Sequence, residues 1–339
     1  FQAEDGIRDA QESRGLGDVY KRQDNKQLKS FEKIERKERK LSKSLLDSIK
    51  NFPKKSHPMD VARTAVSIMG LEDKETADSS PEANMRKAIR ILAKTPTALA
   101  AFYRLRKGKK IIKPKKDLNM ADNFFHMCFG KVPQKEIVKA FDVSLILYAE
   151  HSFNVSTFTA RTITSSLSDI HGAITGAIAS LKGPLHGGAN EEVMHMMNKI
   201  QKPEKALKWI NKALDNKDVV MGFGHRVYKS GDSRVPTMRK YFAKVAKLKK
   251  DKKFEKIYDI VEKVMIDRKN IHPNVDYPTG PTYHLMGFDT DFFTPIFVIS
   301  RITGWSAHIM EQHAANKLIR PLASYKGSQH RKVIQLNQR

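Results

Sequence analysis

The period of its apolar residues is the feature that most limits the fold of this 339-residue chain. Apolar side chains recur three and four residues apart in segment after segment, whereas the alternation of apolar and polar residues that marks a strand is almost absent. Residues 136–181 are the most apolar part, and small residues between Gly172 and Ser180 repeat at the same spacing. Small residues spaced in this way let two helices approach closely. The pattern therefore predicts an all-α fold, with one tight helix contact inside the fold or between subunits.

Charge limits the class of protein. Lys and Arg number 62 against 37 Asp and Glu, a formal net charge of +25 that suits binding to nucleic acid or to an anionic metabolite. The basic residues are spread along the chain, and aromatic residues do not interrupt the basic runs as a stacking platform for nucleic acid requires. We therefore favour a solvated lysine-rich surface, and keep a basic helical nucleic-acid-binding protein as the remote alternative.

Cysteine usage and hydropathy bear on location. The one cysteine, Cys128, cannot form an intramolecular disulfide and suits a reducing compartment. No apolar run is as long as a membrane-spanning helix, and no apolar signal sequence opens the chain. We expect a soluble, cytoplasmic protein without membrane contact.

Some segments depart from a plain helical pattern: the start of the chain, and two segments that contain proline. Residues 1–23 have no sustained apolar period and resemble translated sequencing-adapter tails, so we expect them to be foreign to the fold. From Asp24 the pattern becomes helical. Residues 85–103 predict one long helix that Pro96 should kink or divide. Residues 274–280 predict a turn-rich segment with one central carboxylate.

Three glycine-flanked segments each present one ionisable side chain: His186, His225 and Asp276. Around His186, Pro184 fixes the chain that enters the turn, and the glycine pair at 187–188 permits a close approach to a ligand. Taken separately, each could be an ordinary turn histidine or a capping aspartate. The sequence has no GxGxxG or GxxxxGK[ST], so these two kinds of nucleotide-binding loop are not expected. It also has no GxSxG and no paired metal ligands, so we expect neither a serine hydrolase nor a metal site.

Taken together, these segments resemble the signature segments of the citrate synthase family, in the family's order. They are GPLHGGAN (183–190), GFGHRVY (222–228) followed by DSR (232–234), NVD (274–276), EHSFNVSTFTAR (150–161), and FTP (293–295) through IRP (319–321). The resemblance runs from about residue 24 to about residue 330. Within the family, YPTGP (277–281) and NFFHMCFG (123–130) are most similar to the 2-methylcitrate synthase branch, whose members often also make citrate.

The resemblance implies an acyltransferase. It would condense propionyl-CoA, acetyl-CoA or both with oxaloacetate through an enol, then hydrolyse the thioester to give 2-methylcitrate or citrate and CoA. The alternative is a dedicated citrate synthase that uses only acetyl-CoA, since one methyl group in the acyl pocket is worth only about 1–3 kcal/mol of discrimination. The CoA thioester is a substrate, so no cofactor is expected.

The resemblance also implies roles for the three ionisable residues. Asp276 would remove the α-proton of the acyl group, and neutral His186 would donate a hydrogen bond to the thioester oxygen. His225 would polarise the ketone of oxaloacetate. A base and a hydrogen-bond donor on either side of one acyl group can form an enol near neutral pH.

Oxaloacetate is a dianion, and the resemblance implies a set of cationic partners for it. Arg234 and Arg301 match the carboxylate-binding arginines, and guanidinium suits this role because it pairs bidentately with carboxylate. Arg320 matches an arginine that reaches the site of the partner subunit in a homodimer. His151 matches a further oxaloacetate contact, and Lys229 a contact to CoA phosphates.

Finally, the resemblance implies a two-domain, all-helical dimer. The large domain would comprise residues 24–187 and 291–330 and lack part of its native N-terminus. The small domain, residues 188–290, would close over the substrates. Residues 331–339 would form a C-terminal tail, and the small-residue helix that ends at Leu181 would lie in the dimer interface.

Overall fold

The computed structural model describes residues 24–228, 230–328 and 332–339, so the adapter-like residues 1–23 lie outside it. Its described part is helical and contains no strand; one isolated bridge joins Phe223 to Pro273. The all-α prediction is confirmed. The helices are α2 (Asn25–Glu38), α3 (Lys43–Asn51), α4 (Pro58–Glu72), α5 (Pro81–Arg106), α6 (Met120–Phe129), α7 (Lys135–Tyr148), α8 (Val155–Ser165), α9 (Ile170–Leu181), α10 (Ala189–Ile200), α11 (Pro203–Asp215), α12 (Val235–Leu248), α13 (Lys253–Lys269), α14 (Asp276–Met286), η1 (Thr290–Phe292), α15 (Phe293–Ala314) and η2 (Leu336–Gln338).

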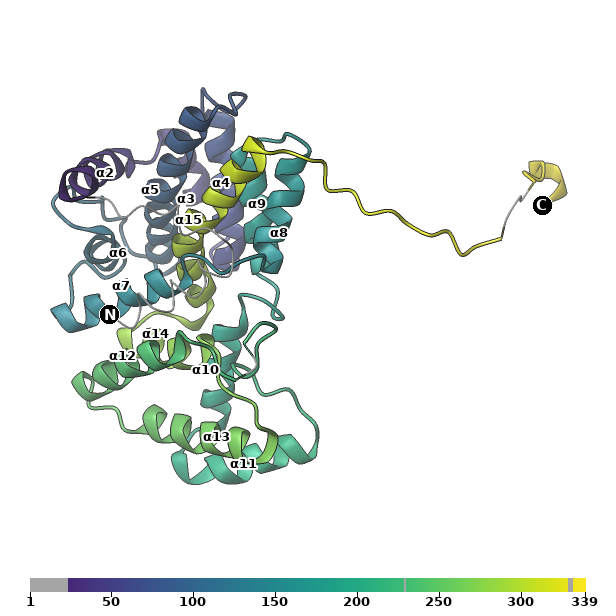
Figure 1. The fold of residues 1–339 in the computed structure, drawn as a ribbon. Helices are drawn as coiled ribbons and strands as arrows, with labels where there is room; N and C mark the ends of the chain where they lie inside the picture. Colours follow the sequence, from purple (N-terminus) through teal and green to yellow (C-terminus); the bar gives the residue numbers. More distant parts are fainter. Residues whose placement is uncertain (1–23, 229, 329–331) are drawn as a thin grey trace.

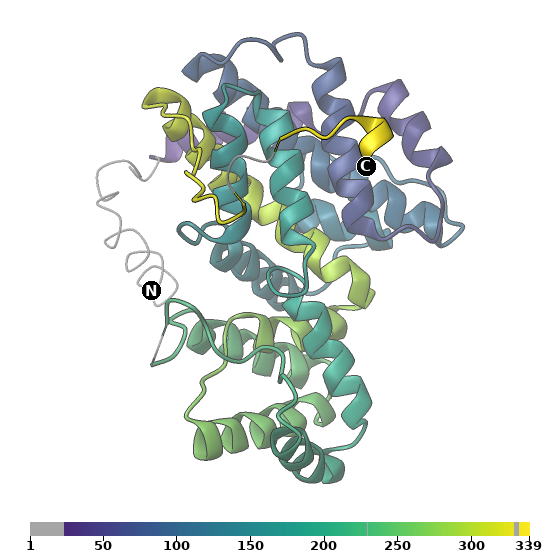
Figure 2. The same ribbon diagram turned by 90° about the vertical axis from the view of Figure 1, so that its right-hand side faces the viewer.

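The helices form two groups (Figure 1). Helices α10 to α14 lie together at the bottom of the view, and the remaining α-helices lie above them with α15 among them. Figure 2 shows the same two groups from the side. The grouping resembles the predicted division at residues 188 and 290, whose boundaries stay a prediction. Within the described residues, every helix is too short or too polar to cross a bilayer.

Local capping signals start several of the helices. The side chain of Asp24 accepts the Gln27 amide while the Gln27 side chain bonds back to the Asp24 amide, a capping box that starts α2. His57 and Pro58 start α4: the His57 side chain accepts the Met59 amide, and Pro58 is the first helical residue. Capping of this kind supplies partners for the free amides of a first helical turn.

The small-residue helix packs tightly within the chain. A Cβ on Gly176 of α9 would lie only 2.2 Å from Cδ1 of Ile163 on α8. Ala173, Ala177 and Leu181 on the same helix are fully buried. Of the two alternatives, an intrachain helix contact is therefore present, and a contact between subunits stays a prediction.

Pro96 lies inside a helix, as predicted, but does not divide it: α5 runs unbroken from Pro81 to Arg106. A kink at Pro96 stays a prediction. The residues from Thr95 to Leu99 are all buried, so packing around the helix offsets the hydrogen bond that proline cannot make.

The segment predicted as turns, residues 274–280, instead contains the start of helix α14 at Asp276. Pro278 stands in the first turn, where the backbone amide has no helical partner, so its missing N–H costs little. Thr279 and Thr282 place their hydroxyls on carbonyls four residues earlier, at 2.7 and 2.6 Å. Burial against α10 and α12 then overrides the turn propensity of the sequence.

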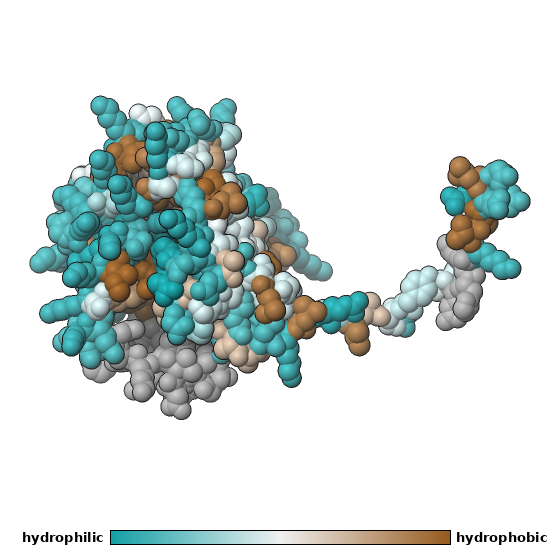
Figure 3. Space-filling view, turned by 90° about the horizontal axis from the view of Figure 1, so that it is seen from above, coloured by the Kyte–Doolittle hydropathy of each residue, from teal (hydrophilic) through white to brown (hydrophobic). Residues whose placement is uncertain are grey.

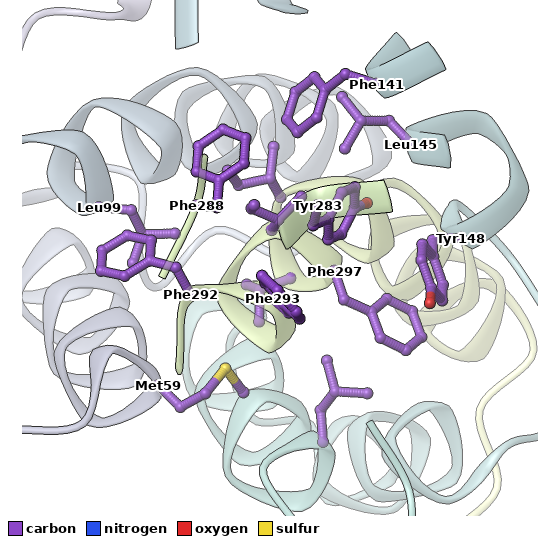
Figure 4. Packing of buried hydrophobic residues seen from close by; sticks show 14 of the residues in the cluster. Met59, Leu99, Phe141, Leu145, Tyr148, Tyr283, Phe288, Phe292, Phe293 and Phe297 are labelled. Atoms are coloured by element: carbon purple, nitrogen blue, oxygen red, sulfur yellow. The ribbon is translucent and has the colours of Figure 1, made fainter. Parts of the chain in front are cut away.

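Aromatic packing fixes the helices beside the junction of the two groups. Figure 4 shows Phe141, Tyr283, Phe288 and Phe293 directed into one cluster. Phe141 stacks on Phe288 with ring centroids 5.7 Å apart, and Tyr283 contacts Phe293 edge-on at 5.7 Å. Because these rings come from α7, α14, the loop after α14 and α15, the cluster holds together the helices that carry much of the candidate site.

Candidate active site

One cavity of about 620 Å³ gathers most of the predicted site residues. It is lined from α7 and the loop after it, from the loop before α10, from residues 219–227, and from α15. The predicted residues that line it are His151, His186, His225, Arg234, Asp276 and Arg301. Residues separated by 150 positions in the sequence thus face one space.

His186 is held as a neutral hydrogen-bond donor. Its Nε2 accepts from the backbone amide of Ser156 at 3.2 Å, and because an amide can only donate, the ring proton belongs on Nδ1. Burial, with the nearby Arg301 charge, lowers the pKa of His186 to about 4. The Ser156 hydroxyl lies 2.8 Å from the same Nε2 and accepts from the Trp305 indole at 3.2 Å. The ring orientation is therefore fixed from α8 and α15.

His225 has its tautomer fixed in the opposite sense. The loop that carries it turns at Gly222, whose φ of 85° is in the left-handed region that glycine adopts readily. Its Nδ1 accepts from the amides of Val227 and Tyr228, at 3.0 and 3.2 Å. The proton of neutral His225 therefore lies on Nε2.

Asp276 begins helix α14, and its environment makes it a stronger base than an ordinary aspartate. Burial raises the pKa of Asp276 to about 6, although the Tyr148 hydrogen bond and the charge of Arg234 act in the opposite direction. The Tyr148 hydroxyl donates to Oδ1 at 2.5 Å. Above pH 6 the carboxylate is thus ionised and able to accept a proton.

Arg234 is buried and oriented by an adjacent carboxylate. Its Nε and Nη2 donate to the two oxygens of Asp232 at 2.9 and 2.7 Å. Asp232 also accepts the Val275 amide at 3.0 Å. One carboxylate therefore fixes both the arginine and the residue that precedes Asp276.

Arg301 is a buried cation with an unsatisfied donor. Its Nε donates to the Tyr148 carbonyl at 2.6 Å, but Nη1 is buried without a hydrogen-bond partner among the described residues. Burial and the neighbouring Arg234 lower the pKa of Arg301 to about 9. A buried guanidinium that lacks a partner is costly, so this position indicates an anionic ligand.

His151 lies beside the two arginines. Its Nε2 is also buried without a partner in the described part of the chain. Burial, with the charges of Arg234 and Arg301, lowers the pKa of His151 to about 3, so the ring is neutral at physiological pH. Its ring centroid is 4.9 Å from that of His225. His151 can therefore offer a neutral hydrogen bond at the same end of the cavity as Arg301.

Of the two remaining predicted site residues, Arg320 does not line this cavity. Arg320 is exposed, beyond the end of α15, where the amide of the preceding Ile319 donates to the Ser165 hydroxyl at 3.0 Å. Lys229 lies outside the described residues. Within the described ranges, no cluster of three or more His, Cys, Asp or Glu side chains could hold a metal ion. The expectation that the chain needs neither metal nor cofactor stays a prediction.

Comparison with known families extends over nearly the whole chain. The family model described as "Citrate synthase, C-terminal domain" matches residues 20–322. The chain belongs to the citrate synthase family. All three of the glycine-flanked segments that carry His186, His225 and Asp276 lie inside the matched range.

Curated relatives in this family have two names. The chain is 52% identical over 318 residues to "2-methylcitrate synthase 2" of Corynebacterium glutamicum, covering 92% of this chain and 83% of the relative. It is 51% identical to "2-methylcitrate synthase" of Mycobacterium tuberculosis, over 90% of this chain and 77% of that relative. It is 50% identical to "Citrate synthase" of Mycolicibacterium smegmatis, covering 91% and 82%.

Solved citrate synthases have the same fold. The citrate synthase of Thermotoga maritima superposes with a TM-score of 0.85 at 35% identity, covering 94% of this chain and 85% of the other. That of Thermoplasma acidophilum, solved as a ternary complex with carboxymethyl coenzyme A and oxaloacetate, gives 0.87 at 30% identity, covering 99% and 91%. The two-domain, all-α citrate synthase fold is therefore confirmed.

Several residues of this citrate synthase site were not predicted from the sequence. Asp232 orients Arg234, Ser156 and Trp305 orient His186, and Tyr148 binds Asp276. Asp232 and Ser156 lie within motifs that the sequence displays, so a search for polar neighbours of the site residues could have found them. Tyr148 ends an apolar helix and has the pattern of an ordinary core residue.

Proposed function

We propose that this chain condenses an acyl-CoA with oxaloacetate and hydrolyses the resulting thioester, giving 2-methylcitrate or citrate and CoA. The observation that carries the proposal is the buried Nη1 of Arg301, which has no hydrogen-bond partner among the described residues. The same cavity is lined by the Asp276 carboxylate and by the neutral imidazoles of His151 and His186. A dianionic substrate would satisfy the guanidinium. The names of the curated relatives support the same reaction.

The first step removes a proton from the acyl group. Asp276 takes the α-proton through a carboxylate oxygen, and the C–H electron pair becomes the enol double bond. His186 donates Nδ1–H to the thioester oxygen, where negative charge develops. The pKa of about 6 for Asp276 and of about 4 for His186 keep the first ionised and the second neutral at pH 7.

The second step joins the two substrates. His225 donates Nε2–H to the ketone oxygen of oxaloacetate, so the ketone carbon is attacked by the enol. Arg234, Arg301 and His151 hold the carboxylates of oxaloacetate, and we propose Lys229 as a contact for CoA phosphates. Water then cleaves the thioester, which releases CoA and makes the overall reaction favourable. Closure of residues 188–290 over the large domain would exclude water while the enol forms.

The experiment that tests this function compares initial rates with propionyl-CoA and acetyl-CoA at fixed oxaloacetate, following the thiol of released CoA. We expect oxaloacetate-dependent thiol release with both, with propionyl-CoA preferred. A propionyl rate near zero would leave the dedicated citrate synthase as the answer, and no release with either thioester would refute the proposal. Nothing in the comparisons favours the nucleic-acid-binding alternative. Cytoplasmic location stays a prediction.

We also propose a homodimer in which Arg320 completes the partner's site. Val155 and Phe158 of α8 are apolar and 61% and 48% exposed, which suggests a covered face. The chain after α15 extends away from the body, as Figures 1 and 3 show, and Arg320 lies near its start. A second copy would give both features a partner.

Subunit mixing tests the shared site. We expect Arg320→Ala and Asp276→Asn each to be nearly inactive alone. After unfolding and refolding together they should recover about one quarter of wild-type activity, because half of the dimers are hybrids and each hybrid has one complete site. Mixing two batches of Arg320→Ala is the control. If the mixture stays as inactive as its components, Arg320 does not act across a dimer.

A further inference from the structure

The Tyr148 hydroxyl contacts the carboxylate of Asp276, although Tyr148 belongs to an apolar helix. Tyr148 is the last residue of α7 and is fully buried. Its hydroxyl donates to Asp276 Oδ1 at 2.5 Å, the short distance typical of an O–H donor on a carboxylate. Asp276 receives no side-chain hydrogen bond on Oδ2 from the described residues.

We propose that Tyr148 is a positioning residue for the base: it fixes Oδ1 of Asp276, directs Oδ2 at the substrate α-carbon, and sets the pH above which the carboxylate is active. The proposal rests on the proposed function, in which Asp276 removes the α-proton. In that step the C–H bond breaks, the proton bonds to Oδ2, and the electron pair enters the enol whose oxygen His186 stabilises.

The tyrosine is rigid enough for this role. Its ring lies against Phe297 with centroids 4.0 Å apart, and Figure 4 shows the two rings side by side. Its backbone carbonyl accepts from Nε of Arg301 at 2.6 Å. The hydroxyl therefore cannot follow the carboxylate if Asp276 rotates, so the hydrogen bond selects one carboxylate orientation.

The charged and titratable groups that face Asp276 come from several elements. Arg234, the N-cap of α12, and Arg301 of α15 stabilise the anion, whereas Asp232, before α12, destabilises it. Tyr148 of α7 is the neutral donor among them, and Tyr283 on α14 bonds instead to Ser144 at 2.8 Å. A hydrogen bond to the ionised form lowers the pKa of a carboxyl group, so loss of the Tyr148 hydroxyl should raise it.

The test is the pH dependence of kcat/KM for Tyr148→Phe, measured from pH 5 to 9 by oxaloacetate-dependent thiol release. We expect the acid limb to move up by about 1–2 pH units and the plateau at high pH to fall about tenfold, because the oriented carboxylate is lost. Tyr283→Phe is the matched control, since it removes a buried hydroxyl nearby without touching Asp276. Its acid limb should coincide with that of the wild type.

Other outcomes are also decisive. If Tyr148→Phe loses the same fraction of activity at every pH, its acid limb is unmoved and Tyr148 is only a packing residue, which overturns the proposal. If Tyr148→Phe does not fold, 3-fluorotyrosine at position 148 keeps the ring and makes the phenol a stronger donor. The acid limb should then move to lower pH, and an unmoved limb overturns the proposal. If the wild-type protein releases no CoA thiol in the presence of oxaloacetate, the proposed function itself is wrong.

Discussion

Asp276→Asn should lower oxaloacetate-dependent thiol release by about 10³-fold or more, because an amide cannot accept the α-proton that the carboxylate removes. The side chain keeps its size, and its carbonyl oxygen can still accept the Tyr148 hydroxyl that now lies at 2.5 Å from Oδ1. Thermal stabilisation by oxaloacetate should persist, since Arg234 and Arg301 remain. Steady-state rates with both thioesters, with oxaloacetate-dependent melting as the control, provide the measurement. Activity within tenfold of the wild type would remove Asp276 from the mechanism.

The same variant should be more stable than the wild type, but only at higher pH. The pKa of Asp276 is about 6 in the folded chain against an ordinary value of 3.8, so the folded state holds the proton more tightly. Stability is therefore lost as pH rises from about 4 through 6. Asparagine has no proton to lose, so the free energy of unfolding of the variant should exceed that of the wild type by up to about 3 kcal/mol at pH 8. Near pH 4 the two should be equal.

Arg301→Met should raise the KM for oxaloacetate by about 100-fold, since a charge-assisted bidentate contact to a carboxylate is lost. It should also leave the ligand-free protein at least as stable as the wild type. Arg301 is 2% exposed and its Nη1 has no partner in the described part of the chain, so replacing it with an apolar side chain removes a desolvation cost. Oxaloacetate titrations of rate and of melting temperature measure both effects.

Arg239→Met provides the matched control for that experiment. Arg239 is satisfied by Asp259 at 2.7 Å and does not line the cavity. Its replacement should leave the KM for oxaloacetate unchanged and lower stability slightly. If Arg301→Met instead lowers the melting temperature of the protein and leaves its KM for oxaloacetate unchanged, Arg301 is a structural residue and the anion site lies elsewhere.

Much of the fold was predictable because its signals are local. Apolar residues at helical spacing predict the helices, and the change of pattern at Asp24 coincides with the start of α2 in the structure. The helix at Asp276 was missed because Pro278 and Pro281 are turn formers whose effect is overcome only by burial between helices distant in the sequence. Tertiary packing of that kind cannot be recognised from the spacing of apolar residues within the segment itself.

Some residues of the site could be predicted from the sequence and others could not. His186, His225 and Asp276 stand out because glycines and prolines flank them, and the structure places all three on one cavity. Tyr148 was missed because a tyrosine that ends a buried helix looks like packing, and only the 2.5 Å contact with Asp276 distinguishes it. Arg320 differs again, since its predicted role depends on a second copy of the chain.

The central claim is spatial: one carboxylate and two imidazoles act on a single acyl group held next to oxaloacetate. A crystal structure of the full chain with oxaloacetate and carboxymethyl coenzyme A tests it most directly. We predict an oxaloacetate carboxylate on Arg301 Nη1 and the carboxymethyl group within hydrogen-bond distance, about 3 Å, of both Asp276 and His186 Nδ1. Oxaloacetate bound away from Arg301, or an analogue whose acyl end does not reach Asp276, would contradict the account.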